Sequence, residues 1–281
     1  MPRIRLDQLL VARGLARSRA DAQALLLAGR VELAGGGSRM LKPGQLVDPD
    51  AGLTVVAGLR WASRGGEKLE AALDGFGITV RGLACLDAGA STGGFTDVLL
   101  ARGARIVYAV DVGRGQLIDR LRRDPRVVNM ERTNLRTLEA LPEHAGLATL
   151  DLSFIGLRQV LPAVRRLLTD DGQVVALVKP QFEAGREAVP RGGVVRDPAV
   201  HREVLLQFGA ALPAAGFQAV GLLRSPITGT DGNVEFLAHL AAGQASSGTA
   251  NSTAARTTPA DRTALESSWH GAVDALTPLT R

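Results

Sequence analysis

Residues 83–95 (LACLDAGASTGGF) constrain the fold more than any other stretch of the chain. A short apolar run ends in an aspartate, and a loop of glycines and hydroxyl residues follows. Phe95, Val98 and Leu99 then recur at helical spacing, so the order predicts a strand, a tight loop and a helix. Glycines let a ligand approach the loop backbone, and a helix start offers unpaired N–H donors. The stretch therefore predicts a ligand site at the end of a strand.

Strand and helix patterns alternate after this stretch, which predicts a parallel sheet with helices on both faces. A turn-rich loop between the last two strands predicts an antiparallel hairpin at one edge. We therefore expect an α/β fold, with a mostly parallel, Rossmann-like sheet of seven strands, plus a small N-terminal α+β module. The strands are predicted at 83–87, 106–110, 126–130, 147–151, 173–178, 218–224 and 233–240, and the helices of this part near 94–102, 115–123, 156–168 and 199–215.

Changes in composition and pattern divide the chain into four parts. Residues 1–59 combine two short helical patterns with short strand-like pieces, and 60–67 form a linker whose two glycines allow a hinge. Residues 68–242 form the large domain, beginning with a helix at Lys68. Residues 243–281 are rich in Ala, Ser, Thr and Gly at their start, so we expect a disordered tail with at most a marginal helix around Trp269 and Leu276.

Positive charge is concentrated at the N-terminus. The whole chain has 33 Lys and Arg against 28 Asp and Glu, a net charge of +5. The first 42 residues contain eight basic and three acidic side chains, and 8 − 3 gives the same excess of +5. Such a patch favours a nucleic acid and salt-dependent binding. A solvated arginine-rich face is the alternative interpretation.

Four charged residues end, or directly follow, apolar strands and should meet at one rim of the sheet: Asp87, Asp111, Asp151 and Lys179. Asp111 follows the glycine loop by ~20 residues, where an acid can accept from both hydroxyls of a ribose. Asp87 could accept from an ammonium group. S-adenosylmethionine fits these requirements. A nicotinamide dinucleotide is the alternative, which the glycine spacing disfavours because it is not GxGxxG.

An acid–base group is expected at the same rim. Pro180 stops a strand and holds Lys179 there, and Glu235 stands in an apolar run where a carboxylate needs a partner. Lys68 would complete the group with Asp151. A lysine oriented by carboxylates can take the proton of a ribose hydroxyl. This chemistry requires no metal, and the histidines show no ligand spacing.

Cys85 is the one cysteine of the chain. A disulfide framework is therefore not expected, which suits a reducing compartment. No apolar run approaches the ~18 residues of a membrane span, and the first residues show no signal-peptide core. We expect a cytoplasmic protein that does not bind a membrane.

The N-terminal pattern resembles the S4 RNA-binding domain. It contains Arg5-Leu6-Asp7, Ser18-Arg19 and Gly29-Arg30-Val31, although the usual Asn/Asp-Gly turn is replaced by residues 33–37. The resemblance implies that RNA is contacted by Arg5, Arg17, Ser18 and Arg19. We include Arg3, which belongs to the same basic N-terminal set, among the expected RNA-binding residues.

The large domain resembles the FtsJ-type ribose 2′-O-methyltransferases, and residues 1–240 together resemble the TlyA family of ribosomal RNA methyltransferases, also called haemolysin A-like proteins. The matching stretches are 63–69, 87–97, 131–134, 151–155 and 177–183. The resemblance implies a catalytic tetrad of Lys68, Asp151, Lys179 and Glu235. It implies that S-adenosylmethionine is bound by Asp87, Gly89, Ser91, Thr92, Gly93, Gly94, Phe95, Asp111 and Asn134.

By the same resemblance, the expected reaction is 2′-O-methylation of cytidine in 16S or 23S ribosomal RNA, or both. The partners would be ribosomal RNA and ribosomal subunits, and a monomer is favoured. Two alternatives stay open. One is a haemolysin-like cytolysin, and the other is a non-catalytic RNA-binding protein with a methyltransferase fold.

Overall fold

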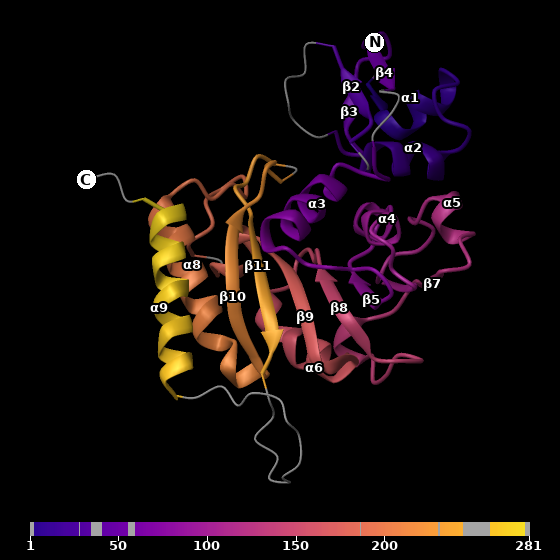
Figure 1. Cartoon of the computed structure of the whole chain (residues 1–281). Helices are drawn as coiled ribbons and strands as arrows, with labels where there is room; N and C mark the ends of the chain where they lie inside the picture. The colour runs from indigo at the N-terminus through magenta and orange to yellow at the C-terminus, as the bar shows by residue number, and fades with distance from the viewer. Residues whose placement is uncertain are drawn as a thin grey trace.

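A computed structural model describes residues 3–27, 29–34, 41–55, 60–185, 187–229, 231–243 and 259–278. Figure 1 shows a small N-terminal domain seated beside a larger domain that is built on one sheet. The expected glycine turn at residues 35–37 lies outside the described part of the chain.

The small domain has a hydrophobic core of its own, in which Leu6, Leu10 and Leu26 are almost fully buried. Its second helix begins with a side-chain cap, because Ser18 Oγ accepts the N–H of Asp21 at 3.1 Å. Two antiparallel strand pairs complete it. The elements are β1 (Ile4–Arg5), α1 (Leu6–Ala12), α2 (Arg19–Leu27), β2 (Val31–Leu33), β3 (Leu46–Val47) and β4 (Leu53–Val55).

The large domain contains the expected seven-stranded sheet, in the order β10-β11-β9-β8-β5-β6-β7. Strands β9, β8, β5, β6 and β7 are parallel, and β11 runs antiparallel to both β9 and β10. The prediction of a mostly parallel sheet with an antiparallel edge hairpin is confirmed. The strands are β5 (Ala84–Ala88), β6 (Ile106–Val110), β7 (Val127–Met130), β8 (Ala145–Leu150), β9 (Leu168–Val178), β10 (Phe217–Arg224) and β11 (Phe236–Ala242).

Helices cover both faces of this sheet (Figure 1). Successive strand residues point to opposite faces, so Cys85 packs with α3 and α4, whereas Leu86 packs with α6 and α8. The helices are α3 (Gly65–Phe76), α4 (Gly94–Ala101), α5 (Asp119–Arg122), α6 (Leu161–Leu167), α7 (Pro180–Glu183), α8 (Pro198–Ala211) and α9 (Pro259–Leu276), with short 3₁₀ turns η1 (Leu135–Thr137), η2 (Leu157–Gln159) and η3 (Pro213–Ala215).

The boundary between linker and large domain differs from the prediction. Helix α3 begins at Gly65, inside the expected linker 60–67, and not at Lys68. The two glycines lie in its first turn. A Cβ on Gly66 would lie 2.5 Å from the Trp61 ring, so the glycine allows the buried indole to pack on the helix backbone. Gly66 is therefore a packing site, and both glycines belong to a helix.

Residues 259–276 form α9, which is longer than the marginal helix expected around Trp269 and Leu276 and extends into the expected disordered tail. This helix packs against α8 and β10 (Figure 1). Val273 is fully buried, and Trp269 donates from Nε1 to the carbonyl of Leu205 at 3.1 Å. Trp269, Val273 and Leu276 follow a helical period, in the stretch where the sequence indicated a helix. The intervening residues 244–258 lie outside the described part.

Replacing Trp269 tests the docking of α9. Trp269→Ala should lower the free energy of unfolding by about 3 kcal/mol because it leaves a cavity in a buried contact. Trp269→Phe keeps an aromatic ring but loses the indole hydrogen bond, and should cost about 1 kcal/mol. Urea denaturation measures both. Equal stability of the wild type and Trp269→Ala would contradict the docked position.

Candidate active site

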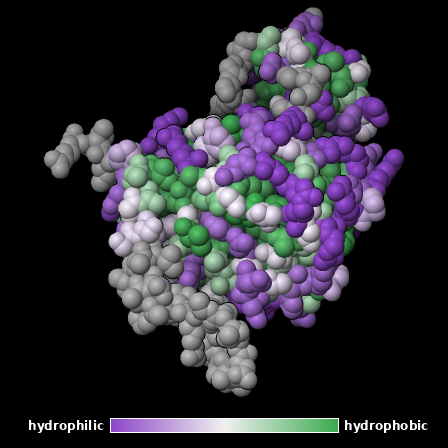
Figure 2. Space-filling view, in the orientation of Figure 1, coloured by the Kyte–Doolittle hydropathy of each residue, from purple (hydrophilic) through white to green (hydrophobic). Residues whose placement is uncertain are grey.

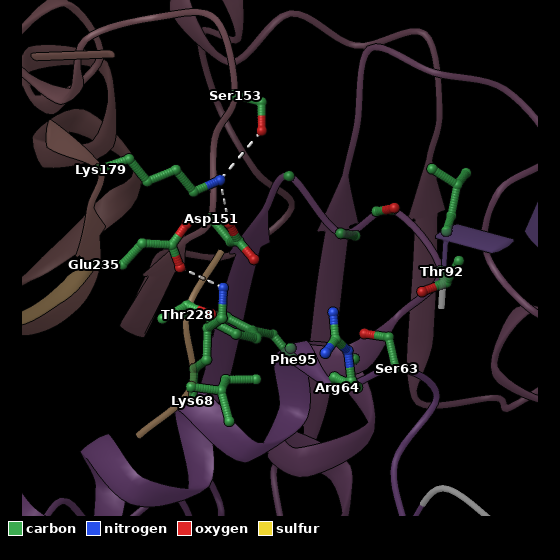
Figure 3. A pocket seen from close by; sticks show the side chains of 17 residues that line it. Ser63, Arg64, Lys68, Thr92, Phe95, Asp151, Ser153, Lys179, Thr228 and Glu235 are labelled. Carbon is green, nitrogen blue, oxygen red and sulfur yellow. Dashed lines mark hydrogen bonds and ion pairs between the residues drawn. The ribbon is translucent and has the colours of Figure 1, made fainter. Parts of the chain in front are cut away.

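Four charged side chains from distant parts of the sequence meet at the carboxyl rim of the sheet (Figure 3). Lys68 lies in α3, Asp151 directly follows β8, Lys179 directly follows β9, and Glu235 directly precedes β11. Lys68 Nζ lies 2.5 Å from Glu235 Oε2, and Lys179 Nζ lies 2.6 Å from Asp151 Oδ1. The structure thus brings the expected tetrad together as two ion pairs.

Three members of the tetrad are almost completely shielded from water. The side chains of Lys68, Lys179 and Glu235 are 10%, 9% and 3% exposed, and that of Asp151 is 25% exposed. Burial alone would raise the pKa of Asp151, but the ammonium groups of Lys179 and Lys68 and the hydrogen bond from Lys179 hold it below its usual value. Asp151 is therefore a carboxylate at neutral pH.

Ser153 is a further polar partner of Lys179. Its Oγ accepts a hydrogen bond from Lys179 Nζ at 3.1 Å (Figure 3). Sequence reasoning did not assign it a role, although it stands two residues after Asp151 in a stretch that follows a buried strand. Lys179 is thus held by a carboxylate and a hydroxyl at once.

A cavity of about 240 Å³ separates the tetrad from the glycine loop. One wall is the loop between β5 and α4, and the opposite wall is formed by the tetrad and Ser153. Ile227 and Thr228, from the loop between β10 and β11, and Leu27 of the small domain also line it. The loop residues that line the cavity are Gly89, Ala90, Ser91, Thr92, Gly94 and Phe95.

The linker between the domains forms part of the same cavity, through Ser63 and Arg64. It is tied to α4, because Asp97 accepts the N–H of Ala62 at 2.8 Å and a hydrogen bond from Arg120 Nη1 at 2.7 Å. Sequence reasoning gave none of these residues a role. The linker sequence shows no period or charge pattern that would have indicated a wall of the site.

Asp87, which was expected to accept from a ligand, does not line the cavity in this structure. Asp87 is fully buried, and its carboxylate accepts hydrogen bonds from Thr96 Oγ1 at 2.6 Å and Thr149 Oγ1 at 3.1 Å. Strand β5 continues to Ala88, so Asp87 stands beside Thr149 within the sheet. Burial raises the pKa of Asp87 to about 6, against the opposing effect of the two threonines.

The glycines of the loop have different physical roles. Gly89 has φ +86° and directly contacts the Asp151 carbonyl, which leaves no room for a side chain. Gly94 meets the hydroxyl of Ser63 in the same way. Gly93 has φ +98° and does not line the cavity, since it packs against Leu117 and Leu121. It permits the close approach of α4 and α5 and does not touch the cavity.

Asp111 and Asn134 lie beyond the cavity, at the ends of neighbouring strands. Asp111 accepts the backbone N–H groups of Ser91 at 2.8 Å and of Gly113 at 2.6 Å. Asn134 is exposed and caps η1. Val112, beside Asp111, is 74% exposed, which is unusual for an apolar side chain of this size. A carboxylate has about four acceptor positions, so Asp111 keeps capacity for a ligand.

A buried aspartate organises the expected RNA-contacting arginines of the small domain. Asp7 is fully buried, and it accepts hydrogen bonds from Arg5 Nη2 and Arg19 Nε, both at 2.9 Å. The hydrogen bond from Arg5 is the largest of several effects that hold the pKa of Asp7 well below its usual value. The other expected contacts, Arg3, Arg17 and Ser18, are exposed.

A family model described as FtsJ-like methyltransferase matches residues 61–242. The chain belongs to the FtsJ-like methyltransferase family. It is 49% identical over 238 residues to the 16S/23S rRNA (cytidine-2′-O)-methyltransferase TlyA of Mycobacterium tuberculosis, a match covering 83% of this chain and 88% of that protein. It is 41% identical over 239 residues to Hemolysin A of Brachyspira hyodysenteriae, covering 84% and 99%.

A solved structure from Streptococcus thermophilus, of a protein named as a hemolysin, is also similar. It has a TM-score of 0.68 and 42% sequence identity, and the match covers 98% of both chains. These relatives confirm the predicted resemblance to the TlyA family. The FtsJ-like methyltransferase match includes the tetrad, the linker from Trp61 onward and the glycine loop, whereas the small domain and α9 lie outside it.

Among the described residues, no group of three or more His, Cys, Asp and Glu side chains is placed to hold a metal ion. In the same part of the chain, every helix is too short or too polar to cross a membrane.

Replacing Asp87 tests its buried state. The folded protein holds a proton on Asp87 up to a pH of about 6, whereas the unfolded chain releases it near pH 4. Wild-type stability should therefore fall by roughly 2–3 kcal/mol as pH rises from 4 to 8. Asp87→Asn should not show this pH-dependent loss of stability. Urea denaturation between pH 4 and pH 8 measures the free energy of unfolding of both proteins.

The exposed carboxylate of Asp119 provides the matched control, since Asp119→Asn should follow the wild-type curve. Parallel curves for the wild type and Asp87→Asn would show that Asp87 is solvated in the folded protein.

Proposed function

We propose that this chain transfers a methyl group from S-adenosylmethionine to the ribose 2′-hydroxyl of a cytidine in 16S or 23S ribosomal RNA, or both. One observation carries the proposal. Two lysine–carboxylate pairs face the glycine loop across a single cavity. Membership of the FtsJ-like methyltransferases supports it, as does the similarity to a relative named for this reaction in M. tuberculosis.

The residues around the glycine loop fit S-adenosylmethionine. Its sulfonium supplies an activated methyl group. Gly89 and Gly94 line the cavity together with the small side chains of Ala90, Ser91 and Thr92. The remaining acceptor positions of Asp111 suit ribose hydroxyls, and the exposed side chain of Val112 offers an apolar support for an adenine ring. Asn134 follows β7, at the same end of the sheet as Asp111.

Lys179 is the residue that we propose accepts the proton. In its neutral form, Nζ takes the proton of the 2′-hydroxyl while the hydroxyl oxygen forms its bond to the methyl carbon and the carbon–sulfur bond breaks. Asp151, held as a carboxylate, stabilises the resulting ammonium group. Lys68 and Glu235, as the second pair, orient the nucleotide beside it. Alignment of the oxygen, carbon and sulfur atoms supplies the rest of the rate enhancement.

RNA binding is assigned to the small domain and to the adjoining flank of the large domain. Asp7 holds the guanidinium groups of Arg5 and Arg19 in fixed positions, and their remaining N–H donors are available to phosphates. Figure 2 shows hydrophilic side chains continuing from the small domain over the region of α5, where Arg114 and Arg123 are exposed. No feature of the described residues favours the cytolysin alternative.

Replacing Lys179 tests the chemistry. Lys179→Ala should lower methyl transfer to ribosomal subunits at least a hundredfold, because removal of a general base costs that much. Binding of S-adenosylmethionine should stay within about twofold, measured by calorimetry. Arg105→Ala, a change of an exposed arginine that is paired with Glu143 before β6, is the control and should keep the wild-type rate. Full activity of Lys179→Ala would refute the mechanism.

The arginine pair of the small domain provides a separate test. The double variant Arg5→Ala/Arg19→Ala should raise KM for ribosomal subunits about tenfold or more, leave kcat unchanged, and reduce the salt slope of binding by about 1 to 2. Arg105→Ala removes a similarly exposed arginine that is paired with Glu143, at the opposite end of the strands. A salt slope equal to the wild-type value would place the RNA elsewhere.

A further inference from the structure

Glu183 is a buried acid that takes no part in the proposed proton transfer. It ends α7, four residues after Lys179, and its side chain is 3% exposed. Oε1 accepts the N–H of Leu157 at 2.6 Å. Within the described part of the chain Oε2 accepts no hydrogen bond, and its nearest cation, Arg158 Nε, is 3.9 Å away. Burial raises the pKa of this carboxyl. A polar group left half-satisfied in this way needs an explanation.

The contact with Leu157 fixes one end of the loop that follows β8. This loop runs from Asp151 to Leu157, where η2 begins. Lys179 holds its other end, through Asp151 at 2.6 Å and Ser153 at 3.1 Å. The segment 179–183 therefore holds the loop 151–157 at both ends.

The loop needs this restraint because its backbone is strained. Phe154 has φ +65°, a left-handed conformation that residues other than glycine rarely adopt. Its side chain is 91% exposed, so burial of the ring contributes little to offset the backbone strain. The Phe154 ring contacts the ring of Phe182, with the ring centroids 5.3 Å apart. Phe182 also belongs to segment 179–183.

The position of Ser153 determines how the amine of Lys179 is oriented. An ammonium group has three N–H donors, and Asp151 and Ser153 accept two of them. The third N–H position becomes the lone pair when the amine is neutral. With both acceptors in place, this lone pair points in one fixed direction. Without Ser153, the amine can rotate about its bond to Asp151.

We propose that Glu183 is a positioning residue for Lys179, which holds loop 151–157 so that Ser153 stays within hydrogen-bond distance of Nζ. The inference rests on the proposed function, because it concerns the residue that takes the proton. Glu183 does not line the cavity. Its effect passes through Leu157 and Ser153.

Two variants distinguish the effect of the side-chain length of Glu183 from the effect of its charge. Glu183→Asp keeps the carboxylate but withdraws it from Leu157, and should lower kcat for methyl transfer to ribosomal subunits about tenfold or more. Glu183→Gln keeps the acceptor in place without the charge, and should stay within about twofold of the wild-type kcat. Calorimetry should give the same Kd for S-adenosylmethionine in both, because the residue lies outside the cavity.

A double-mutant cycle tests the route through Ser153. If Glu183 acts through this hydroxyl, Ser153→Ala/Glu183→Asp should be about as slow as Ser153→Ala alone. Trp269→Ala, which destabilises a remote contact, is the control for stability and should keep the wild-type kcat while folded.

The outcomes separate this inference from the proposed function. A wild-type chain that transfers no methyl group overturns both. With an active wild type, three results overturn only the role of Glu183. These are an unchanged kcat in Glu183→Asp, a Glu183→Gln variant as slow as Glu183→Asp, and losses that add in the double variant.

Discussion

Two lysine–carboxylate pairs lie at the carboxyl rim of the sheet, and one of them reaches the helix that begins the large domain. Asp151, Lys179 and Glu235 are supplied by three neighbouring strands, and Lys68 by α3. Because the pairs are mostly shielded from water, loss of one member would leave a buried charge, which typically costs 3–5 kcal/mol. The Lys68–Glu235 pair therefore fixes α3 relative to the sheet, and the Lys179–Asp151 pair joins the ends of β9 and β8. They also place the four charges where a methyl-transfer reaction could use them.

Close contacts at three glycines hold the linker, α3 and the glycine loop together. Gly66 lies under Trp61, Gly89 against the Asp151 carbonyl, and Gly94 against Ser63. A Cβ at any of these glycines would overlap its neighbour, and the contacts of Gly89 and Gly94 join segments that are far apart in the sequence. The linker consequently belongs to the site, and the small domain contacts the cavity through Leu27. RNA bound to the small domain would lie beside the proposed reaction centre.

Buried carboxylates behind functional groups recur in this structure. Asp7 orients Arg5 and Arg19 in the small domain, Asp97 ties the linker to α4, and Glu183 fixes the loop that carries Ser153. A carboxylate accepts several N–H donors at once, so one buried acid can hold two segments in register. The hydrogen bonds that it accepts offset the free energy of burying its charge.

The sequence by itself determined the seven-stranded sheet, its edge hairpin and the position of Asp151 and Lys179 at strand ends, because apolar periodicity is local and parallel strands end at one rim. Only the tertiary structure decided which side chains meet. Asp87 sits one residue before the end of β5 and pairs with Thr149 across the sheet, while Ser153, Arg64 and Leu27 reach the cavity from other segments. The docking of α9 was likewise decided by Leu205 and Gly209, far from Trp269 in sequence. Such contacts depend on packing between distant segments, which a local pattern does not encode.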